Sequence, residues 1–175
     1  QAQGSYDIEP RYVYFDHSVD SNIWAVFAQD EFNQVQRLTL SAGLRYDHYE
    51  TFGGTTNPRF GAIYAADPAT NVKILYGRAF RSPIAYELYY SGGTSKANPN
   101  LKPETIATYE LVLDRRLDRN LRLLASGYRY DLEGLTALVT DPADSLNWYI
   151  NQGHVYASGI EAEIGCKRGT VRHAL

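Results

Sequence analysis

The chain has 175 residues and a net charge of −3, and 44% of its residues are hydrophobic while 21% are charged. This length fits one domain, and this composition is typical of a folded chain rather than a disordered one. The 17 basic residues are spread among 20 acidic ones instead of forming a basic stripe, which excludes nucleic acid as a partner.

The residue types that build metal and disulfide sites are scarce. Cys166 is the one cysteine, which excludes a disulfide framework and cysteine-based zinc sites. The four histidines are too scattered to suggest a metal cluster, so we expect no metal site, no cofactor and no metal-dependent hydrolase. No apolar run approaches the roughly 18 residues that a transmembrane helix needs, which leaves a membrane-spanning barrel open.

The clearest predicted strand runs from Arg37 to Asp47. Leu38, Leu40 and Leu44 alternate there with polar residues over eleven positions. A period of two indicates a strand with one apolar and one polar face. A tilted strand that crosses a bilayer needs about 9–11 residues, whereas soluble strands average about five or six. The length therefore favours a membrane strand.

The same pattern recurs along the chain with varying clarity. It predicts seven strands and the beginning of an eighth at Thr170. No capped helical stretch is visible, so we expect an all-β, antiparallel fold. The predicted strands are Asn22–Phe32, Arg37–Asp47, Asn57–Ala66, Val72–Phe80, Ala107–Leu113, Leu121–Glu133 and Tyr156–Ile164.

The predicted connectors alternate in length. Those between strands are short at Asn33–Gln36, Asp67–Asn71, Arg116–Asn120 and Gly165–Gly169. The intervening ones are longer: Glu50–Thr56, Arg81–Glu104 and Glu133–Asn147. Outer-membrane barrels have this asymmetry, with short periplasmic turns and long extracellular loops. The fold class is therefore predicted to be a segment of an antiparallel transmembrane β-barrel.

Six short strings fall at matching places in this pattern. The strings are Phe27-Ala28-Gln29-Asp30-Glu31, Leu44-Arg45-Tyr46-Asp47, Asn57-Pro58-Arg59-Phe60-Gly61, Ala79-Phe80-Arg81-Ser82-Pro83, Asn98-Pro99-Asn100-Leu101-Lys102-Pro103-Glu104 and Ser158-Gly159-Ile160-Glu161-Ala162-Glu163. In this order and spacing they resemble the barrel of TonB-dependent outer-membrane receptors, over roughly Trp24 to Ile164.

The resemblance implies a barrel of about 22 strands, plugged by an N-terminal domain, in the outer membrane of a Gram-negative bacterium. Such receptors import ferric siderophores, haem, cobalamin or similar scarce solutes. Three partners are expected. The first is the TonB energy-coupling complex, which would be contacted through the plug domain. The others are a metal chelate and outer-membrane lipid. Because the sequence begins with Gln and contains no Met, residues 1–175 are expected to be part of a barrel, without the plug domain and the remaining strands.

Charged side chains alternate with apolar ones along the predicted strands. At mid-membrane depth an Arg on the lipid face costs about 2–4 kcal/mol, so these charges are expected to face the lumen. There they could steer an anionic chelate or hold the plug, but a solvated cross-strand lattice without a ligand role is favoured. The apolar set Leu40, Leu44, Leu111 and Ile160 should face lipid. The predicted lumen-facing residues are Arg37, Arg45, Arg59, Glu110, Arg122, Glu161 and Glu163.

The long loop Arg81–Glu104 is the predicted ligand-binding segment. It combines aromatic and charged residues, which suit a catecholate or hydroxamate chelate through stacking and cation contact. The alternative is an aromatic girdle at the outer interface, which is favoured for Tyr86 and equally balanced for Tyr89 and Tyr90. The candidate residues are Arg81, Glu87, Tyr89, Tyr90 and Lys96.

Three alternative functions are less well supported. The haem receptors of this family carry an iron-binding His between strings like Phe80–Pro83 and Asn98–Leu101. This sequence has no His between the two strings, which makes haem a weaker candidate than a siderophore. A soluble, aromatic-rich carbohydrate-binding module is disfavoured by strand length and loop parity. A barrel hydrolase would need a Ser with a positioned His, which neither Ser82 nor Ser158 has, so no catalytic residue and no enzyme are predicted.

Overall fold

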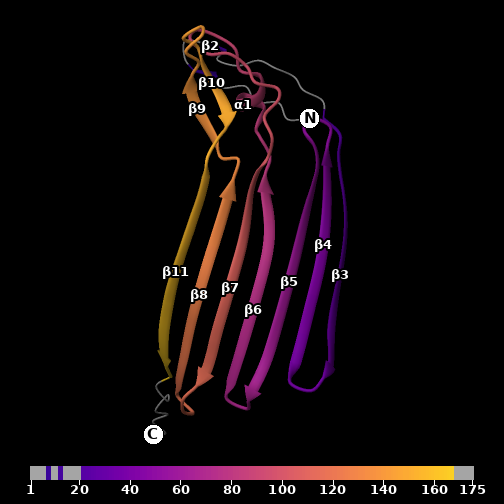
Figure 1. Ribbon diagram of the computed structural model, residues 1–175, viewed down its shortest axis with the longest axis vertical. Helices are drawn as coiled ribbons and strands as arrows, with labels where there is room; N and C mark the ends of the chain where they lie inside the picture. Colours follow the sequence, from indigo (N-terminus) through magenta and orange to yellow (C-terminus); the bar gives the residue numbers. More distant parts are fainter. Residues whose placement is uncertain (1–6, 9–11, 14–20, 168–175) are drawn as a thin grey trace, which may run out of the picture.

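The computed structural model describes residues 7–8, 12–13 and 21–167. Seven long antiparallel strands form one sheet in the spatial order β11-β8-β7-β6-β5-β4-β3 (Figure 1). The prediction of an all-β, antiparallel fold is confirmed. The strands are β3 (Ile23–Val35), β4 (Leu38–Tyr49), β5 (Gly53–Asp67), β6 (Thr70–Arg81), β7 (Glu104–Arg116), β8 (Leu121–Glu133) and β11 (His154–Cys166).

Shorter elements lie outside this sheet. The strands β1 (Asp7–Ile8) and β2 (Tyr12–Val13) pair with each other, as do β9 (Thr136–Thr140) and β10 (Asn147–Asn151). The helix α1 (Ala85–Tyr89) follows β6. Within the described ranges, no helix is long and apolar enough to cross a membrane.

The expectation that no helix forms is wrong at α1. The backbone N–H of Ile84 donates to Oε2 of Glu87 at 3.0 Å, so a carboxylate in the first turn satisfies a donor at the start of the helix. Because Ser, Thr, Asp and Asn are the usual residues at this position, the start at Ile84 carries no cap signal in the sequence.

The predicted alternation of loop lengths is only partly correct. β5 begins at Gly53, four positions before the predicted start, and the connector 50–52 is therefore as short as the turns at the opposite end of the sheet. Gly53 has a φ of 89°, which suits the tight entry into β5. The two connectors 82–103 and 134–153 are long, and both lie at the upper end in Figure 1. The strand predicted from Thr170 lies outside the described residues.

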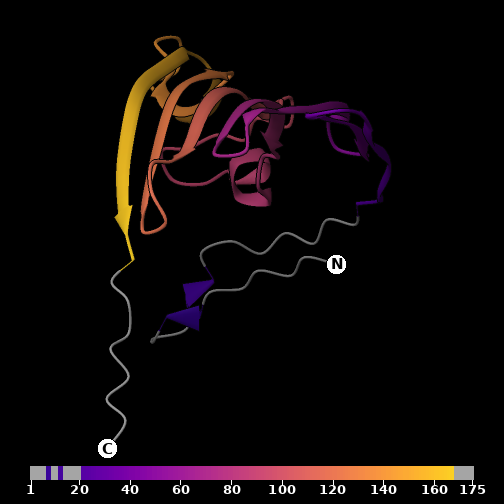
Figure 2. The same cartoon turned by 90° about the horizontal axis from the view of Figure 1, so that it is seen from below.

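The register places the two predicted sets of residues on opposite faces. Leu40 pairs with Ala62, and successive partners run through Ile74 and Leu111 to Ile160, so all of these share one face. Figure 2 shows that the sheet bends into an arch with α1 on its concave side. Arg81 contacts Glu87 of α1, so the face that contains Arg81 is the concave one.

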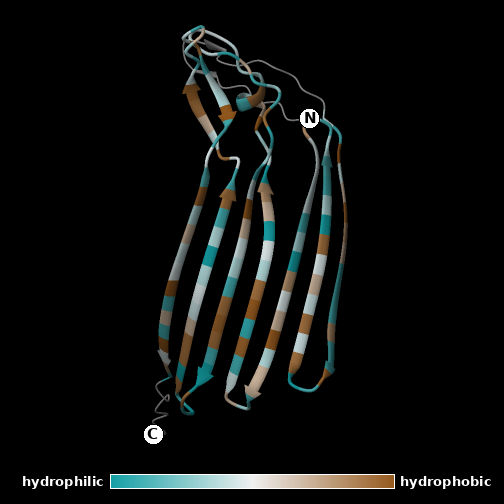
Figure 3. Ribbon diagram, viewed as in Figure 1, coloured by the Kyte–Doolittle hydropathy of each residue, from teal (hydrophilic) through white to brown (hydrophobic). Residues whose placement is uncertain are grey.

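The convex face therefore carries the apolar residues, and they are exposed. Leu111 is 55% and Ile160 is 87% exposed, while fully buried apolar side chains are few in the described part of the chain. The sheet is one layer thick over most of its length, and its apolar residues alternate with polar ones along the strands (Figure 3). An open, single-layer sheet with one apolar face is the arrangement expected for a segment of a transmembrane barrel wall.

The predicted lumen residues Arg45, Arg59, Glu110, Arg122, Glu161 and Glu163 all share the concave face by register. Arg37 does not, because it lies in the turn before β4 with a φ of 67°. Arg45 is bonded to Asp47 at 2.6 Å. Arg122 reaches Asp114 on the neighbouring strand, and Lys73 lies 3.9 Å from the same carboxylate.

Glycine allows close contacts on the concave face, as at Gly159. A Cβ at Gly159 would lie 2.5 Å from Oη of Tyr128, so this side chain occupies the space that a larger residue would need. Tyr128 also stacks on Tyr130 at 4.9 Å between ring centroids. Nothing lies within 4 Å of a Cβ built at Gly127, which is open.

Candidate functional site

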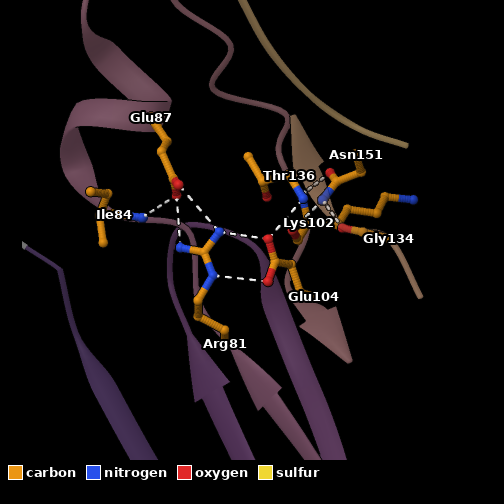
Figure 4. Close-up of polar contacts among 8 residues, drawn as sticks. All are labelled: Arg81, Ile84, Glu87, Lys102, Glu104, Gly134, Thr136 and Asn151. Carbon is orange, nitrogen blue, oxygen red and sulfur yellow. Dashed lines mark hydrogen bonds and ion pairs between the residues drawn. The ribbon is translucent and has the colours of Figure 1, made fainter. Parts of the chain in front are cut away.

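The base of the long loop 82–103 is closed by an ion pair. Arg81 ends β6 and Glu104 begins β7, and the two are register partners. The Nε and Nη2 atoms of Arg81 donate to Glu104 at 3.0 and 2.7 Å. Both Nη atoms also donate to Glu87 of α1 at 3.2 Å. Arg81 thus fixes the helix against the strand ends (Figure 4).

The charges of this pair are strongly stabilised. Both residues lie at the loop end of the sheet, outside the apolar band. Hydrogen bonds from Arg81 lower the pKa of Glu104 to about 2, and the N–H of Thr136 adds to the effect. The hydrogen bonds to Glu104 and Glu87 raise the pKa of Arg81. The pair is therefore fully ionised at neutral pH.

Glu104 also connects the first long loop to the second. The backbone N–H of Thr136, the first residue of β9, donates to Oε1 of Glu104 at 2.7 Å. Beside it, the Asn151 side chain accepts from the N–H of Lys102 at 2.7 Å and donates to the carbonyls of Lys102 and Gly134 at 2.8 Å (Figure 4). The Asn151 amide therefore pairs with the backbone of Lys102 as a strand residue would.

The string Asn98–Glu104 runs along the β9–β10 hairpin. Nδ2 of Asn98 donates to the carbonyl of Tyr149 at 2.8 Å, and Oδ1 of Asn98 accepts from the N–H of Asn100 at 3.1 Å. Leu101 is only 1% exposed and anchors the segment. The string is thus a docking segment between the two long loops.

Lys96 joins the loops near the tip of the hairpin. Its Nζ donates to Asp141 at 2.5 Å and to Asp144 at 2.7 Å, and it lies 4.7 Å from the ring centroid of Trp148. Hydrogen bonds to Asp141 and Asp144 raise the pKa of Lys96, and the same bonds lower the pKa of both carboxyl groups. The N–H of Lys96 also donates to the carbonyl of Asn147 at 2.9 Å.

Aromatic side chains from both loops meet. Tyr86 stacks on Tyr90 at 4.5 Å, and the edge of Tyr149 from β10 approaches Tyr86 at 6.3 Å. The girdle interpretation favoured for Tyr86 is wrong, because Tyr86 belongs to α1 on the concave side, whereas the convex aromatic row contains Tyr76 and Tyr109. Tyr89 is half-buried in α1.

The five predicted ligand-loop residues all lie in this assembly. Arg81, Glu87 and Lys96 bind one another or carboxylates of the second loop, and Tyr89 and Tyr90 end the helix segment. Their role in ligand binding stays a prediction. The contribution of the second loop, 134–153, is not among the sequence-based predictions, although the alternation of Asn147, Tyr149 and Asn151 with apolar residues is a strand signal.

Residues of the described segments do not gather into a metal site. No group of three or more His, Cys, Asp or Glu side chains within them could hold a metal ion. His154 begins β11, and its Nε2 lies 3.8 Å from Asp131. The arrangement offers aromatic rings and hydrogen-bonding groups held by a polar network.

Comparison with known proteins places the chain in a family. The family model "TonB dependent receptor-like, beta-barrel" matches residues 1–169. The iron-regulated outer membrane virulence protein of Vibrio cholerae is 29% identical over 132 residues, which is 72% of this chain and 20% of that protein. The vitamin B12 transporter of the same species is 29% identical over 140 residues, or 80% of this chain and 22% of the transporter.

Two further matches agree with this placement. The heme/hemopexin utilization protein C of Haemophilus influenzae is 28% identical over 162 residues and covers 73% of this chain and 23% of that protein. A crystal structure of a mutant ferric enterobactin receptor from Pseudomonas aeruginosa superposes with a TM-score of 0.72 at 21% identity, over 81% of this chain and 24% of the receptor. The chain thus spans about a fifth of the curated relatives it matches, and it belongs to the β-barrel of the TonB-dependent receptor family.

Proposed function

We propose that this chain forms part of the barrel wall of an outer-membrane receptor that binds and imports a ferric siderophore. The observation that carries the proposal is the joint wall formed by the loops 82–103 and 134–153, in which the ring of Tyr86 contacts both Tyr90 and Tyr149. Flat aromatic rings held at a loop end offer stacking surface to a catecholate or similar aromatic chelate. The relative described as iron-regulated supports iron as the cargo.

In this proposal the charged and aromatic residues have different tasks. Each of the cations Arg81 and Lys96 is already bonded to two carboxylates, so their full charge is not available to a ligand. They hold the loops in place, and Tyr89 and Tyr90 supply contact surface. Import would then use energy from the TonB complex, delivered through a plug domain, across the outer membrane of a Gram-negative bacterium.

Haem is the second candidate cargo, because one relative is a haem utilization protein. The loops 82–103 and 134–153 contain no histidine, but they contain tyrosines, and a Tyr can ligate haem iron. If these two loops supply the iron ligand, that ligand is a tyrosinate, which has a distinct absorption spectrum. The siderophore remains the preferred cargo because a chelate that stacks on aromatic rings needs no side chain that binds its iron.

The test is ligand binding by the full-length receptor that contains this segment. Purified receptor is titrated with a ferric catecholate, a ferric hydroxamate, haemin and cyanocobalamin. Saturable binding of a ferric siderophore, weakened in the Tyr89→Ala/Tyr90→Ala variant, supports the proposal. Binding of haemin or cobalamin without binding of either siderophore would overturn it. The Tyr64→Ala variant, which changes a convex residue near the opposite end of the sheet, is the matched control.

A further inference from the structure

The convex face changes character along the strands. Its central row is apolar and contains Ile74, Leu111 and Ile160. The next row toward the loops contains the three aromatic residues Phe60, Tyr76 and Tyr109, followed by Arg129 on β8. Amphipathic aromatic rings mark the level at which the hydrocarbon of a membrane meets the headgroups. Residues above this row therefore lie at headgroup depth in an outer-membrane barrel.

A groove of about 290 Å³ lies at this depth, and all of its lining residues belong to the convex face. Its floor is β7, which carries the small residues Thr105 and Ala107 where its neighbours carry long ones. Arg78 of β6 stands on one side. The other side carries Arg129, Asp131 and Glu133 of β8 and His154 of β11. The groove thus has a cationic wall and a wall that carries both signs of charge, with tyrosines at its lower end.

The two arginines of the groove are in different electrostatic states. Arg129 is bonded to Asp131 at 3.0 Å, and its guanidinium lies 5.6 Å from the ring of Tyr156. Arg78 is exposed, and within the described part of the chain it has neither an ion pair nor a side-chain hydrogen bond. An uncompensated cation on the lipid side of a barrel needs an anionic partner from the membrane.

We propose that this groove binds the phosphorylated sugar headgroup of an outer-leaflet glycolipid. Arg78 takes the phosphate, since a guanidinium donates two parallel hydrogen bonds to phosphate oxygens. The carboxylates of Asp131 and Glu133 accept hydrogen bonds from sugar hydroxyls. The rings of Tyr76 and Tyr109 lie at the end of the groove that faces the acyl chains. A headgroup with both phosphate and hydroxyls matches a groove with both a cation and carboxylates.

Lipid, rather than free phosphate, is the source that the position favours. The groove opens on the face that continues into the apolar rows, so a ligand held there also has its chains placed against Leu111 and Ile160. Inorganic phosphate would gain only the contact with Arg78. The proposal rests on the outer-membrane placement of the receptor but not on the identity of the imported chelate, so lipid binding and chelate binding are measured separately.

The experiment uses the full-length receptor in phosphatidylcholine nanodiscs and measures lipid binding by native mass spectrometry. The probes are a bisphosphorylated acylated glucosamine disaccharide, its dephosphorylated form, phosphatidylglycerol and inorganic phosphate. We expect the phosphorylated glycolipid to bind best and the Arg78→Gln variant to bind it about tenfold more weakly, the loss of one charge-assisted contact. Arg78→Lys should recover part of the affinity.

The matched control is Arg115→Gln. Arg115 is an exposed arginine on the same convex face at the opposite, short-turn end of β7, and its loss should leave binding unchanged. Ala107→Trp, which fills the floor of the groove and leaves every charge in place, should also weaken binding. Heat-modifiable migration verifies that each variant has assembled. Equal binding by wild type and Arg78→Gln, or equal binding of phosphatidylglycerol, overturns the proposal. Displacement of the glycolipid by millimolar phosphate overturns its lipid part.

Discussion

Arg81 and Glu104 are 23 positions apart in the chain, yet their side chains are joined by hydrogen bonds of 2.7 and 3.0 Å at the end of the sheet that carries the long loops. The same two residues hold α1 through Glu87 and the second loop through Thr136. A loop of this length loses entropy when its ends are joined, and the strands β6 and β7 already provide that closure. The ion pair therefore acts on the orientation of the loop, not on its closure.

We predict that Glu104→Gln weakens the coupling of the two long loops. The amide oxygen can replace Oε1 and accept from both Nη2 of Arg81 and the N–H of Thr136, but the amide nitrogen then replaces Oε2 and places a donor against Nε of Arg81, so one charge-assisted bond is lost. The affinity of the full-length receptor for its chelate should fall about tenfold, as expected for about 1.4 kcal/mol. Titration with the chelate checks this. Glu110→Gln, in the middle of β7, is the control, and equal losses in both variants would contradict the prediction.

The loop network should be insensitive to pH across the neutral range. The pKa of Glu104 is lowered from 4.5 to about 2, so its stabilising effect is complete above about 4.5 and is lost as the pH falls toward 2. The pKa of Lys96 is raised above its ordinary 10.5, so its contribution is complete below that value and is lost only at higher pH. The fluorescence of Trp148, followed in a receptor whose other tryptophans, Trp24 among them, are replaced by Phe and within the range where the receptor stays folded, should be flat between about pH 5 and 9. A transition near pH 6–7 would contradict this assignment.

The sequence revealed the sheet better than the loops. The alternation of Leu38, Leu40 and Leu44 reflects one face that is apolar and one that is polar, and a period of two is visible without knowledge of any neighbour. The start of β5 was missed because Gly53–Thr56 contains no apolar residue to reveal the alternation. The predicted alternation of short and long connectors is wrong at the same place, because the connector between β4 and β5 has three residues and not the predicted longer loop.

The site depends on contacts between residues that are far apart in the chain. Lys96 looked like a free cation because Asp141 and Asp144 lie 45 and 48 positions away. The contact of Asn151 with the backbone of Lys102 leaves no signal in the sequence, because the two residues are 49 positions apart. The aromatic residues of the first loop were visible, but not their contact with Tyr149, which depends on how the hairpin folds back.

Substitution of two strand glycines should have opposite consequences. Gly159→Ala places a Cβ against the ring of Tyr128, which must move away from Tyr130, and the expected loss of stability is about 1–3 kcal/mol. Gly127→Ala meets no atom within 4 Å and removes conformational freedom from the unfolded chain, so it should be neutral or stabilising by about 0.4–1 kcal/mol. Urea unfolding of the refolded full-length receptor in lipid vesicles measures both. Equal effects would mean that Tyr128 does not occupy the space above Gly159.

The two faces of β7 should differ in what reaches them. Leu111 and Glu110 are adjacent, but Leu111 pairs with Ile74 on the convex face and Glu110 pairs with Leu75 on the concave face. A shift of the register by one residue would exchange them, so this pair tests which face of β7 meets the lipid. Cysteine variants of the full-length receptor carrying a nitroxide label should respond to oxygen at position 111, because oxygen concentrates in hydrocarbon. They should respond to a water-soluble nickel complex at position 110. A background without native cysteines, which includes Cys166→Ser, avoids labelling elsewhere, and reversed accessibilities at the two positions would show that the apolar face is not the lipid face.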